Sequence, residues 1–566
     1  MRLNLKARKE NSYDAIVVGT GVSGGWAAKE LTEKGLNTLV LERGRNVRHV
    51  ADYPTMTKEP WDLPRNDNLT PEEAEEYKIH QRTGYILRES TKHWLTKDAE
   101  QPYEEKKRFD WVRGYHVGGR SLLWGRQCLR LGPHDFEGNA KDGVGVDWPI
   151  RYNDLEKWYD YVEEFAGISG QAEGLPQCPD GIFLPPFEMN CVEKHAREQI
   201  SEQFPGRVLT MGRFANLTQP HKGRGTCQYR NKCMRGCPYG AYFSSNSTTL
   251  PAASQTGNMT LRPHSVVSSV IYDEESRKAS GVRVIDAETG DEHEFYAKII
   301  FLNASCIGST LIMLNSTSDR FPDGLGNDSG ELGHNLMDHH FRVGASGRYD
   351  GFMDKYYYGR RPGSVHMPRY RNIANDRRDY LRGFHFQGGA SREGWWRGVR
   401  ELAIGEKLKE FVQTPGEWAM GLNGFGEMLP YHSNRMWLNR DETDKYGIPI
   451  VVFDVEFKEN EYKMREDMKN DAAEMLEAVG FKDISTYDDP GGPGLAIHEM
   501  GTARMGNDPN TSVLNKWNQV HTVPNVFVTD GACMTSSANQ NPSLTYMALT
   551  ARAADYAVDQ LRKGNL

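Results

Sequence analysis

The sequence predicts a mixed α/β protein in which a Rossmann-like domain is interrupted by an inserted domain, built on a mainly antiparallel β-sheet flanked by helices. The chain of 566 residues is longer than one hydrophobic core usually serves, so at least two domains are expected. A strand, a helix and a second strand are predicted near its start, and a strand followed by a helix at its end. The two ends therefore belong to one α/β domain, and the strand-rich region between them contains the insertion.

The composition and charge exclude several classes of protein. Apolar residues make up 38% of the chain and charged residues 26%, as in globular proteins. No apolar run approaches the roughly 18 to 20 residues that span a bilayer, so we expect no direct membrane span. A net charge of −8 argues against a nucleic-acid surface. The N-terminus lacks the apolar stretch of a secretory signal, so export would need a partner.

The first predicted element is a dinucleotide-binding unit over residues 13–44. It comprises a strand at 14–18, a helix at 23–34 and a second strand that ends at Glu42. The G-x-G-x-x-G pattern between strand and helix allows a tight turn and close approach to a pyrophosphate, which the helix N-terminus attracts. The carboxylate can accept ribose hydroxyls, and both NAD and FAD fit this unit. The expected contact residues are Gly19, Gly21, Gly24, Glu42 and Arg43.

The middle of the chain predicts where the two domains divide. A strand meander is expected at 261–304, with turns at positions 280–281 and 289–290. From residue 341 the composition shifts toward arginine, glycine and aromatic residues, and an acidic helix follows at 459–480. We therefore assign residues 10–340 and 490–566 to the dinucleotide-binding domain and residues 341–489 to the inserted domain.

Four further blocks carry a family resemblance: RGYHVGGRSLLWG at 113–125, HEMGTARMG at 498–506, VTDGA at 528–532 and NPSLTYMALTAR at 541–552. With the glycine-rich unit, in this order and at these separations, they make the chain resemble the glucose-methanol-choline (GMC) oxidoreductases over nearly its whole length. The resemblance implies the GMC fold, FAD as the bound dinucleotide and a substrate-binding role for the inserted domain.

The resemblance also implies which further residues contact FAD. The double-glycine block would pack its backbone against the flavin, the VTDGA block would lie near the phosphates and ribityl chain, and a valine in HSVV would neighbour the adenine. These residues are Gly118, Gly119 and Ser121, then Asp530 and Gly531, and finally Val267. Some relatives attach FAD through a histidine in a T-H-W sequence, whereas Leu122, Leu123 and Trp124 stand here. We therefore expect non-covalent FAD.

The same resemblance places a catalytic pair at His498 and Asn541. Oxidising an alcohol requires removal of its hydroxyl proton while hydride leaves the carbon, so a near-neutral imidazole suits the base and an amide can hold the developing oxyanion. Taken alone, the histidine fits a hydrogen-bonded core position and the asparagine fits a helix cap before Pro542. The position of both within the family blocks favours the catalytic assignment.

Three of the eight cysteines lie in the segment 223–243. Cys227, Cys233 and Cys237 form C-x5-C-x3-C-P, which ends like the cluster runs of bacterial ferredoxins, and three thiolates suit a 3Fe-4S cluster. The spacing also allows a zinc site with His221 or His264 as a further ligand, or three free cysteines. The segment resembles the cluster segment of bacterial FAD sugar dehydrogenases, which implies the 3Fe-4S cluster on the FAD side.

The chain is most similar to the FAD-dependent, iron–sulfur-containing catalytic subunits of bacterial glucoside 3-dehydrogenases. That resemblance implies oxidation of a ring hydroxyl, at C3 of glucose, glucosides or disaccharides, to a keto sugar. Such subunits reach the periplasm with a small export-helper subunit and pass electrons to a cytochrome c. The aromatic and polar stretches at 385–398 and 424–439 suit sugar rings, although such stretches also occur as simple packing.

Several alternatives remain open at this point. An iron–sulfur cluster passes electrons one at a time, which suits a dehydrogenase with a cytochrome acceptor. An oxygen-using GMC sugar or alcohol oxidase has no need of such a cluster. A dehydrogenase for gluconate or fructose fits the same blocks. A non-enzymatic FAD-binding electron carrier and a cytoplasmic location are the remaining alternatives.

Overall fold

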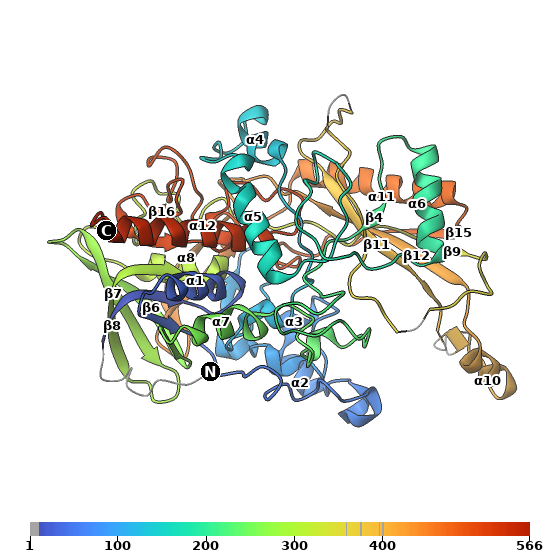
Figure 1. The fold of residues 1–566 in the computed structure, drawn as a ribbon, viewed down its shortest axis with the longest axis horizontal. Coiled ribbons are helices and arrows are strands. Elements are labelled where there is room, and N and C mark those ends of the chain that lie inside the picture. Colours follow the sequence, from blue (N-terminus) through green and yellow to red (C-terminus); the bar gives the residue numbers. More distant parts are fainter. Residues whose placement is uncertain (1–10, 358, 374–375, 395–396, 399–400) are drawn as a thin grey trace.

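The computed structural model describes residues 11–566 except 358, 374–375, 395–396 and 399–400. Figure 1 shows two regions, one sheet with its helices on the left and a second sheet with its helices on the right. Trp395 and Trp396, which belong to the aromatic stretch noted above, and residues 1–10 lie outside the described residues. Within the described part of the chain, no helix has both the length and the apolarity that crossing a bilayer requires.

An eight-stranded sheet forms the first region. β1 (Ser12–Val18) lies near its centre, parallel to β2 (Thr38–Leu41) on one side and to β8 (Glu292–Leu302) on the other. The strand–helix–strand unit predicted for residues 13–44 is confirmed, with α1 (Val22–Glu33) as its helix. The other strands are β5 (Met259–Arg262), β6 (Ser265–Asp273), β7 (Lys278–Asp286), β16 (Gln519–Val520) and β17 (Val523–Val528).

One of the two turns predicted in the meander is wrong. β7 runs through Gly281, and the hairpin from β6 turns at residues 274–277 instead. The glycine serves a close backbone approach, because a Cβ there would collide with the Phe295 carbonyl of β8. The turn predicted at 289–290 is confirmed between β7 and β8.

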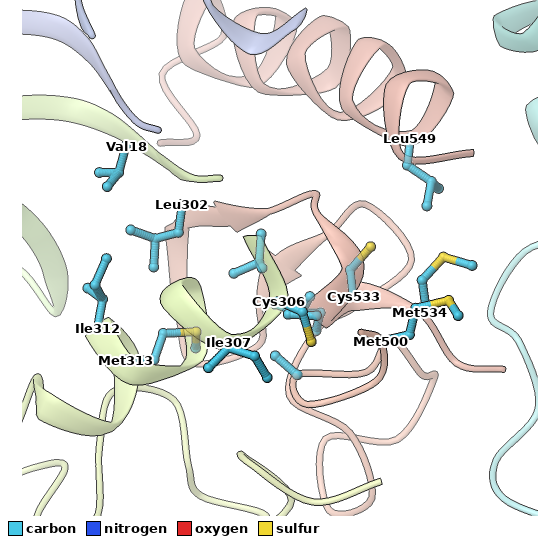
Figure 2. Close-up of a cluster of buried hydrophobic side chains, with 14 of the residues drawn as sticks. Val18, Leu302, Cys306, Ile307, Ile312, Met313, Met500, Cys533, Met534 and Leu549 are labelled. Carbon is cyan, nitrogen blue, oxygen red and sulfur yellow. The ribbon is translucent and has the colours of Figure 1, made fainter. Parts of the chain in front are cut away.

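Alternate side chains of β1 serve two separate cores, as expected for a sheet covered on both faces. Ala15 and Val17 belong to the core with α1 and α12 (Ser543–Arg562). Ile16 and Val18 belong to the core with α8 (Ser305–Asn315). Figure 2 shows side chains of this second core, which come from both ends of the chain, from Val18 to Leu549. Further α-helices are α2 (Pro71–Glu76), α3 (Lys78–Gln81), α4 (Pro133–Asp142), α5 (Tyr152–Ala166), α7 (Thr249–Gln255) and α10 (Glu406–Gln413).

A six-stranded sheet forms the second region, on the right of Figure 1. Its neighbouring strands are all antiparallel, which confirms a mainly antiparallel sheet. α11 (Glu459–Val479) and α6 (Cys191–Gln203) pack together and contribute to its core. In order across the sheet the strands are β15 (Lys482–Asp488), β9 (Val343–Tyr349), β12 (Trp418–Gly426), β11 (Phe384–Arg392), β10 (Val365–Met367) and β4 (Thr210–Met211).

Two segments pack across the predicted domain boundaries. α6 and β4 precede residue 341 but supply side chains to the core of the second sheet. Conversely, β13 (Arg435–Thr443) and β14 (Pro449–Asp454) form a separate three-stranded sheet with β3 (Tyr103–Glu105). There Phe453 stacks on Phe109 with 4.1 Å between ring centroids. The division of the chain at residues 340 and 490 stays a prediction.

Candidate active site

A cavity of about 1050 Å³ lies between the two large sheets. It is larger than the roughly 300–1,000 Å³ typical of a site for one small molecule, so it has room for a dinucleotide and a substrate. Gly21, after β1, belongs to one wall, whereas Gln387 of β11 and Phe425 of β12 belong to the other. The predicted site residues that line the cavity are Gly19, Gly21, Glu42, Arg43, Gly119, Ser121, Cys233, Val267, His498, Asp530, Gly531 and Asn541.

The turn after β1 forms one end of the cavity. Gly21 is the N-cap of α1 and makes no side-chain capping bond, so the first N–H groups of the helix are available to an anion. Gly24 lies behind this turn, where a Cβ would collide with the Gly19 carbonyl. Two buried polar atoms on the wall, Asn303 Oδ1 and the Tyr546 hydroxyl, have no hydrogen-bond partner among the described residues. These features fit the pyrophosphate and other polar atoms of a dinucleotide.

A chain of hydrogen bonds joins Glu42 to the double-glycine block. The Thr20 hydroxyl donates to Glu42 Oε2 at 2.5 Å and accepts the Gly118 N–H at 2.9 Å. The other carboxylate oxygen accepts the Gly44 N–H at 3.0 Å. Burial raises the pKa of Glu42, and these donors oppose the shift. Gly118, which has a φ of 93° and does not line the cavity itself, is thereby held beside the glycine-rich turn.

Asp530 shapes a third part of the wall. One of its oxygens accepts the Ser309 hydroxyl at 2.5 Å, and the other accepts the Ala532 N–H at 3.0 Å. Burial raises the pKa of Asp530 to about 6. These two bonds fix the carboxyl group beside the backbone turn at Gly531, on the wall of the cavity.

His498 and Asn541 lie together on the cavity wall. Asn541 Nδ2 is 3.5 Å from His498 Nε2. Gln387 Nε2 donates to Asn541 Oδ1 at 2.8 Å and also lies 2.9 Å from His385 Nε2. Because the Asn541 carbonyl is occupied by Gln387, its N–H group is directed toward the imidazole.

The neighbouring residues Asp338 and His339 hold His498 in place. Asp338 Oδ2 accepts the N–H groups of Gly494 at 2.7 Å and Ala496 at 3.1 Å, and Oδ1 accepts the His498 N–H at 3.1 Å. Burial raises the pKa of Asp338 to about 7. His339 Nδ1 lies 2.9 Å from His498 Nδ1.

The surroundings of His498 keep its ring neutral. Burial holds the pKa of His498 well below its ordinary value, and the positive charge of Arg120 acts in the same direction. A neutral imidazole can accept a proton at neutral pH. The arrangement can therefore remove the proton of a hydroxyl placed between imidazole and amide, while the Asn541 N–H stabilises the oxygen left negative.

The three predicted cluster cysteines adjoin this cavity but do not form a metal site as they stand. All three are free and partly exposed, and Cys233 lines the cavity. Burial raises the pKa of Cys227 to about 11, and Cys233 and Cys237 are among its electrostatic neighbours. In the part of the chain that the structure describes, no three His, Cys, Asp or Glu side chains come together as metal ligands.

The histidines considered for a zinc site have other neighbours. His221 Nε2 lies 2.8 Å from the Glu164 carbonyl oxygen. His264 Nε2 lies 4.0 Å from a carboxylate oxygen of Glu288. Neither belongs to a group of three ligand side chains among the described residues.

The fold and the cavity define an oxidoreductase that binds a dinucleotide beside a histidine–asparagine pair. Two family models described as GMC oxidoreductase match, one over residues 13–341 and the other over residues 430–550. The chain belongs to the GMC oxidoreductase family. Members of this family bind FAD and act on CH–OH donors, so the GMC fold and the dinucleotide inferred from the sequence are confirmed.

Several relatives match nearly the whole chain. It is 29% identical to the 2-methyl-1,2-propanediol dehydrogenase of Mycolicibacterium austroafricanum, over 96% of this chain and 94% of the relative. It is 26% identical to the fructose dehydrogenase large subunit of Gluconobacter japonicus, over 98% and 99%. Among solved structures, formate oxidase from Aspergillus oryzae aligns with a TM-score of 0.61 and 15% identity, over 98% of this chain and 99% of that one. The structural likeness shows the fold alone.

Sequence reasoning missed the residues that orient the histidine–asparagine pair. Gln387 lay in the stretch 385–398, considered only for sugar binding in general, and Asp338 and His339 were not singled out. Their signal was a run of polar residues beside apolar ones, as in MDHH and HFQ. Such a run does not show which residue the polar side chain contacts, because His498 and Asn541 lie more than 150 residues away in the sequence from His339 and Gln387.

Proposed function

We propose that this chain is an FAD-dependent sugar dehydrogenase that oxidises a secondary ring hydroxyl, at C3 of glucose, glucosides or disaccharides, to a keto sugar. The observation that carries the proposal is the His498–Asn541 pair on the wall of the cavity that also contains the dinucleotide cradle. The names of the fructose and diol dehydrogenases support a substrate with several hydroxyls. FAD is held without a covalent bond in this proposal, since Leu122, Leu123 and Trp124 offer no attachment histidine.

The chain's own residues bind the sugar and move its proton. His498 takes the proton of the reacting hydroxyl, and the Asn541 N–H donates to the oxygen that remains. Phe341 and Phe425, whose rings stack at 5.2 Å between centroids, line the cavity and offer an apolar face to a pyranose ring. When bound, FAD supplies the hydride acceptor.

The proposal includes a 3Fe-4S cluster held by Cys227, Cys233 and Cys237. Three free thiols in one segment support this ligand set, with Cys233 and Cys237 as neighbours of Cys227 and Cys233 on the cavity wall. When bound, such a cluster supplies one-electron transfer, which suits a cytochrome c or another single-electron acceptor. Periplasmic location by co-export with a small helper subunit belongs to the same proposal and is supported by the family resemblance.

Fructose is the second candidate substrate. The fructose dehydrogenase large subunit matches this chain over 98% of its length, and a ring secondary hydroxyl is available in that sugar as well. The cavity, the base and the amide would serve both sugars in the same way, so only the substrate would differ.

An anaerobic titration of the purified protein tests this proposal. Glucose, a methyl glucoside, fructose and 2-methyl-1,2-propanediol are added in turn while the flavin absorbance and low-temperature EPR spectra are recorded. We expect glucose and the glucoside to bleach the flavin, with a ketone at ring C3 in the product NMR spectrum and loss of an oxidised 3Fe-4S signal.

The other outcomes separate the parts of the proposal. Bleaching by fructose alone would replace glucose with the second candidate. Bleaching by the diol but by no sugar would overturn a sugar substrate. Flavin bleaching without any iron signal would return the three cysteines to a structural role, and peroxide release with sugar in air would identify an oxidase.

A further inference from the structure

His339 is a buried histidine that lies behind the cavity wall, next to the proposed base. It is 1% exposed and belongs to the block that precedes β9. Burial lowers the pKa of His339 to about 4, so its ring is neutral at neutral pH. A neutral imidazole has one N–H and one acceptor nitrogen, so its neighbours decide which nitrogen carries the proton.

The neighbours of His339 determine its tautomer. His339 Nε2 lies 2.8 Å from the Ala538 carbonyl oxygen and 3.3 Å from that of Ser537. A carbonyl oxygen can only accept a hydrogen bond, so Nε2 carries the proton. His339 Nδ1 is therefore the acceptor nitrogen, and it faces His498 Nδ1 at 2.9 Å.

This contact determines the tautomer of His498 in turn. Two nitrogen atoms at 2.9 Å share one hydrogen, and because His339 Nδ1 has none to give, His498 Nδ1 must donate it. His498 Nε2, which lies 3.5 Å from Asn541 Nδ2, then keeps its lone pair. The opposite tautomer would bring two lone pairs together and would place a proton on the nitrogen that has to accept one.

We propose that His339 is a positioning residue that selects the Nδ1–H tautomer of His498 and so leaves His498 Nε2 free to accept the substrate proton. When the proton moves from the substrate oxygen to Nε2, His498 becomes an imidazolium whose Nδ1–H still donates to His339. The inference rests on the proposed role of His498 as the base, but not on which alcohol is the substrate.

The place of His498 depends on a different residue. Asp338 holds the loop of residues 494–498 through three backbone N–H bonds, including that of His498 itself. Removing the acceptor nitrogen at position 339 should therefore change the tautomer of His498 more than its position. This separation makes His339 a clean target for substitution.

Two variants distinguish tautomer selection from packing. His339→Leu fills similar volume without an acceptor, whereas His339→Gln offers a carbonyl oxygen to the His498 Nδ1–H. Both are compared with wild type and His498→Ala, using whichever of glucose, fructose or 2-methyl-1,2-propanediol bleaches the wild-type flavin fastest. We expect His339→Leu to lower kcat about 10- to 100-fold with KM changed less than about threefold, and His339→Gln to recover most of kcat.

Equal losses in both variants, or a loss that appears in KM alone, would overturn the inference, because packing and not the acceptor would then matter. A His339→Leu enzyme as fast as wild type beside an inactive His498→Ala enzyme would overturn it too. Activity retained by His498→Ala would instead overturn the proposed base, and sugars that fail while the diol is oxidised would overturn only the sugar substrate.

A direct measurement needs no change at position 339. Nitrogen NMR of the wild-type protein, labelled at its histidine rings and with His498 assigned by comparison with His498→Ala, reports which ring nitrogen carries the proton. We expect the proton on Nδ1. A proton on Nε2 would overturn the inference even if the position-339 variants did not fold.

Discussion

The His498 site and the cysteine segment 223–243 adjoin one cavity but are held in different ways. At His498, the backbone N–H donates to Asp338 and both ring nitrogens have a neighbour within 3.5 Å. In the segment, Cys227 Sγ accepts one N–H bond, at 3.5 Å, and no three ligand side chains of the described residues form a metal site. The chain alone therefore organises the base, whereas the geometry of the thiols depends on what they bind.

Electrostatics separate the same two regions. Burial keeps His498 neutral, which is the form that a base requires. In the segment, Lys232 and Arg235 form ion pairs with Glu59 and Asp67 from outside it, and burial raises the pKa of Cys227 to about 11. Iron binding at Cys227 would therefore have to displace the proton of its thiol group. Changes at His498 should thus alter the chemistry with the fold intact, and changes at the thiols should alter the path of the electrons.

The largest expected effect follows removal of the base. His498→Ala should lower kcat by about a hundred- to ten-thousandfold, the usual contribution of a general base, while FAD stays bound. Stopped-flow bleaching of the flavin measures the rate, and the visible spectrum checks the cofactor. His334→Ala, a partly exposed histidine that bonds the His432 carbonyl, is the control and should leave the rate unchanged. Near-wild-type turnover of His498→Ala would show that another group is the base.

Loss of the amide should have the next largest effect. Asn541→Asp keeps an oxygen for the Gln387 donor but replaces the N–H that faces His498 with a carboxylate oxygen. We expect kcat to fall by about a hundredfold, as when one donor to an oxyanion is removed. Single-turnover kinetics check this value. The structure gives Asn541 no capping bond, since Pro542 is the N-cap of α12, so an Asp variant as fast as wild type would show that the Asn541 N–H takes no part in the reaction.

The pH dependence sharpens the electrostatic difference. His498 must be neutral to act, and its pKa lies well below the ordinary value of 6.5, so the acid limb of kcat/KM should lie below pH 6.5. At pH 5.5 a base of ordinary pKa would keep only about a tenth of its activity, whereas we expect a loss of less than about twofold. Steady-state rates across pH, with flavin retention as the control, test this. An acid limb at or above pH 6.5 would contradict the buried environment.

The smallest effect on substrate oxidation is expected at the thiols. Cys233→Ser should leave flavin bleaching by substrate within about twofold of wild type, because the thiol takes no part in the proton transfer. Turnover with a one-electron acceptor, the iron content and the EPR signal should all fall. Cys191→Ser, a partly exposed cysteine outside the segment, is the matched control and should change none of them. Unchanged iron in Cys233→Ser would remove this cysteine from the cluster proposal.

The parts of this protein that were predictable from the sequence are local. The glycine spacing after β1, the helix that follows and the carboxylate at the end of β2 occur within a single unit of the chain, and the structure confirms its strands and helix. The turn at 280–281 was predicted wrongly because Gly281 lies within β7, where its lack of a Cβ allows the backbone of the neighbouring strand β8 to come close. The sequence alone does not distinguish a glycine required for a close contact between strands from a glycine required for a turn.

By itself, the sequence determined the dinucleotide unit, through residue types at short spacings, and the family, through blocks in a fixed order along the chain. The histidine and asparagine were singled out by the family resemblance. Only the tertiary structure decided which groups orient them. His339 and His498 are 159 residues apart, and Gln387 and Asn541 are 154 apart. Their contacts exist because the two regions pack around one cavity. The direction of each hydrogen bond, and with it the nitrogen that can accept a proton, is a property of neighbours in space and not of neighbours in the chain.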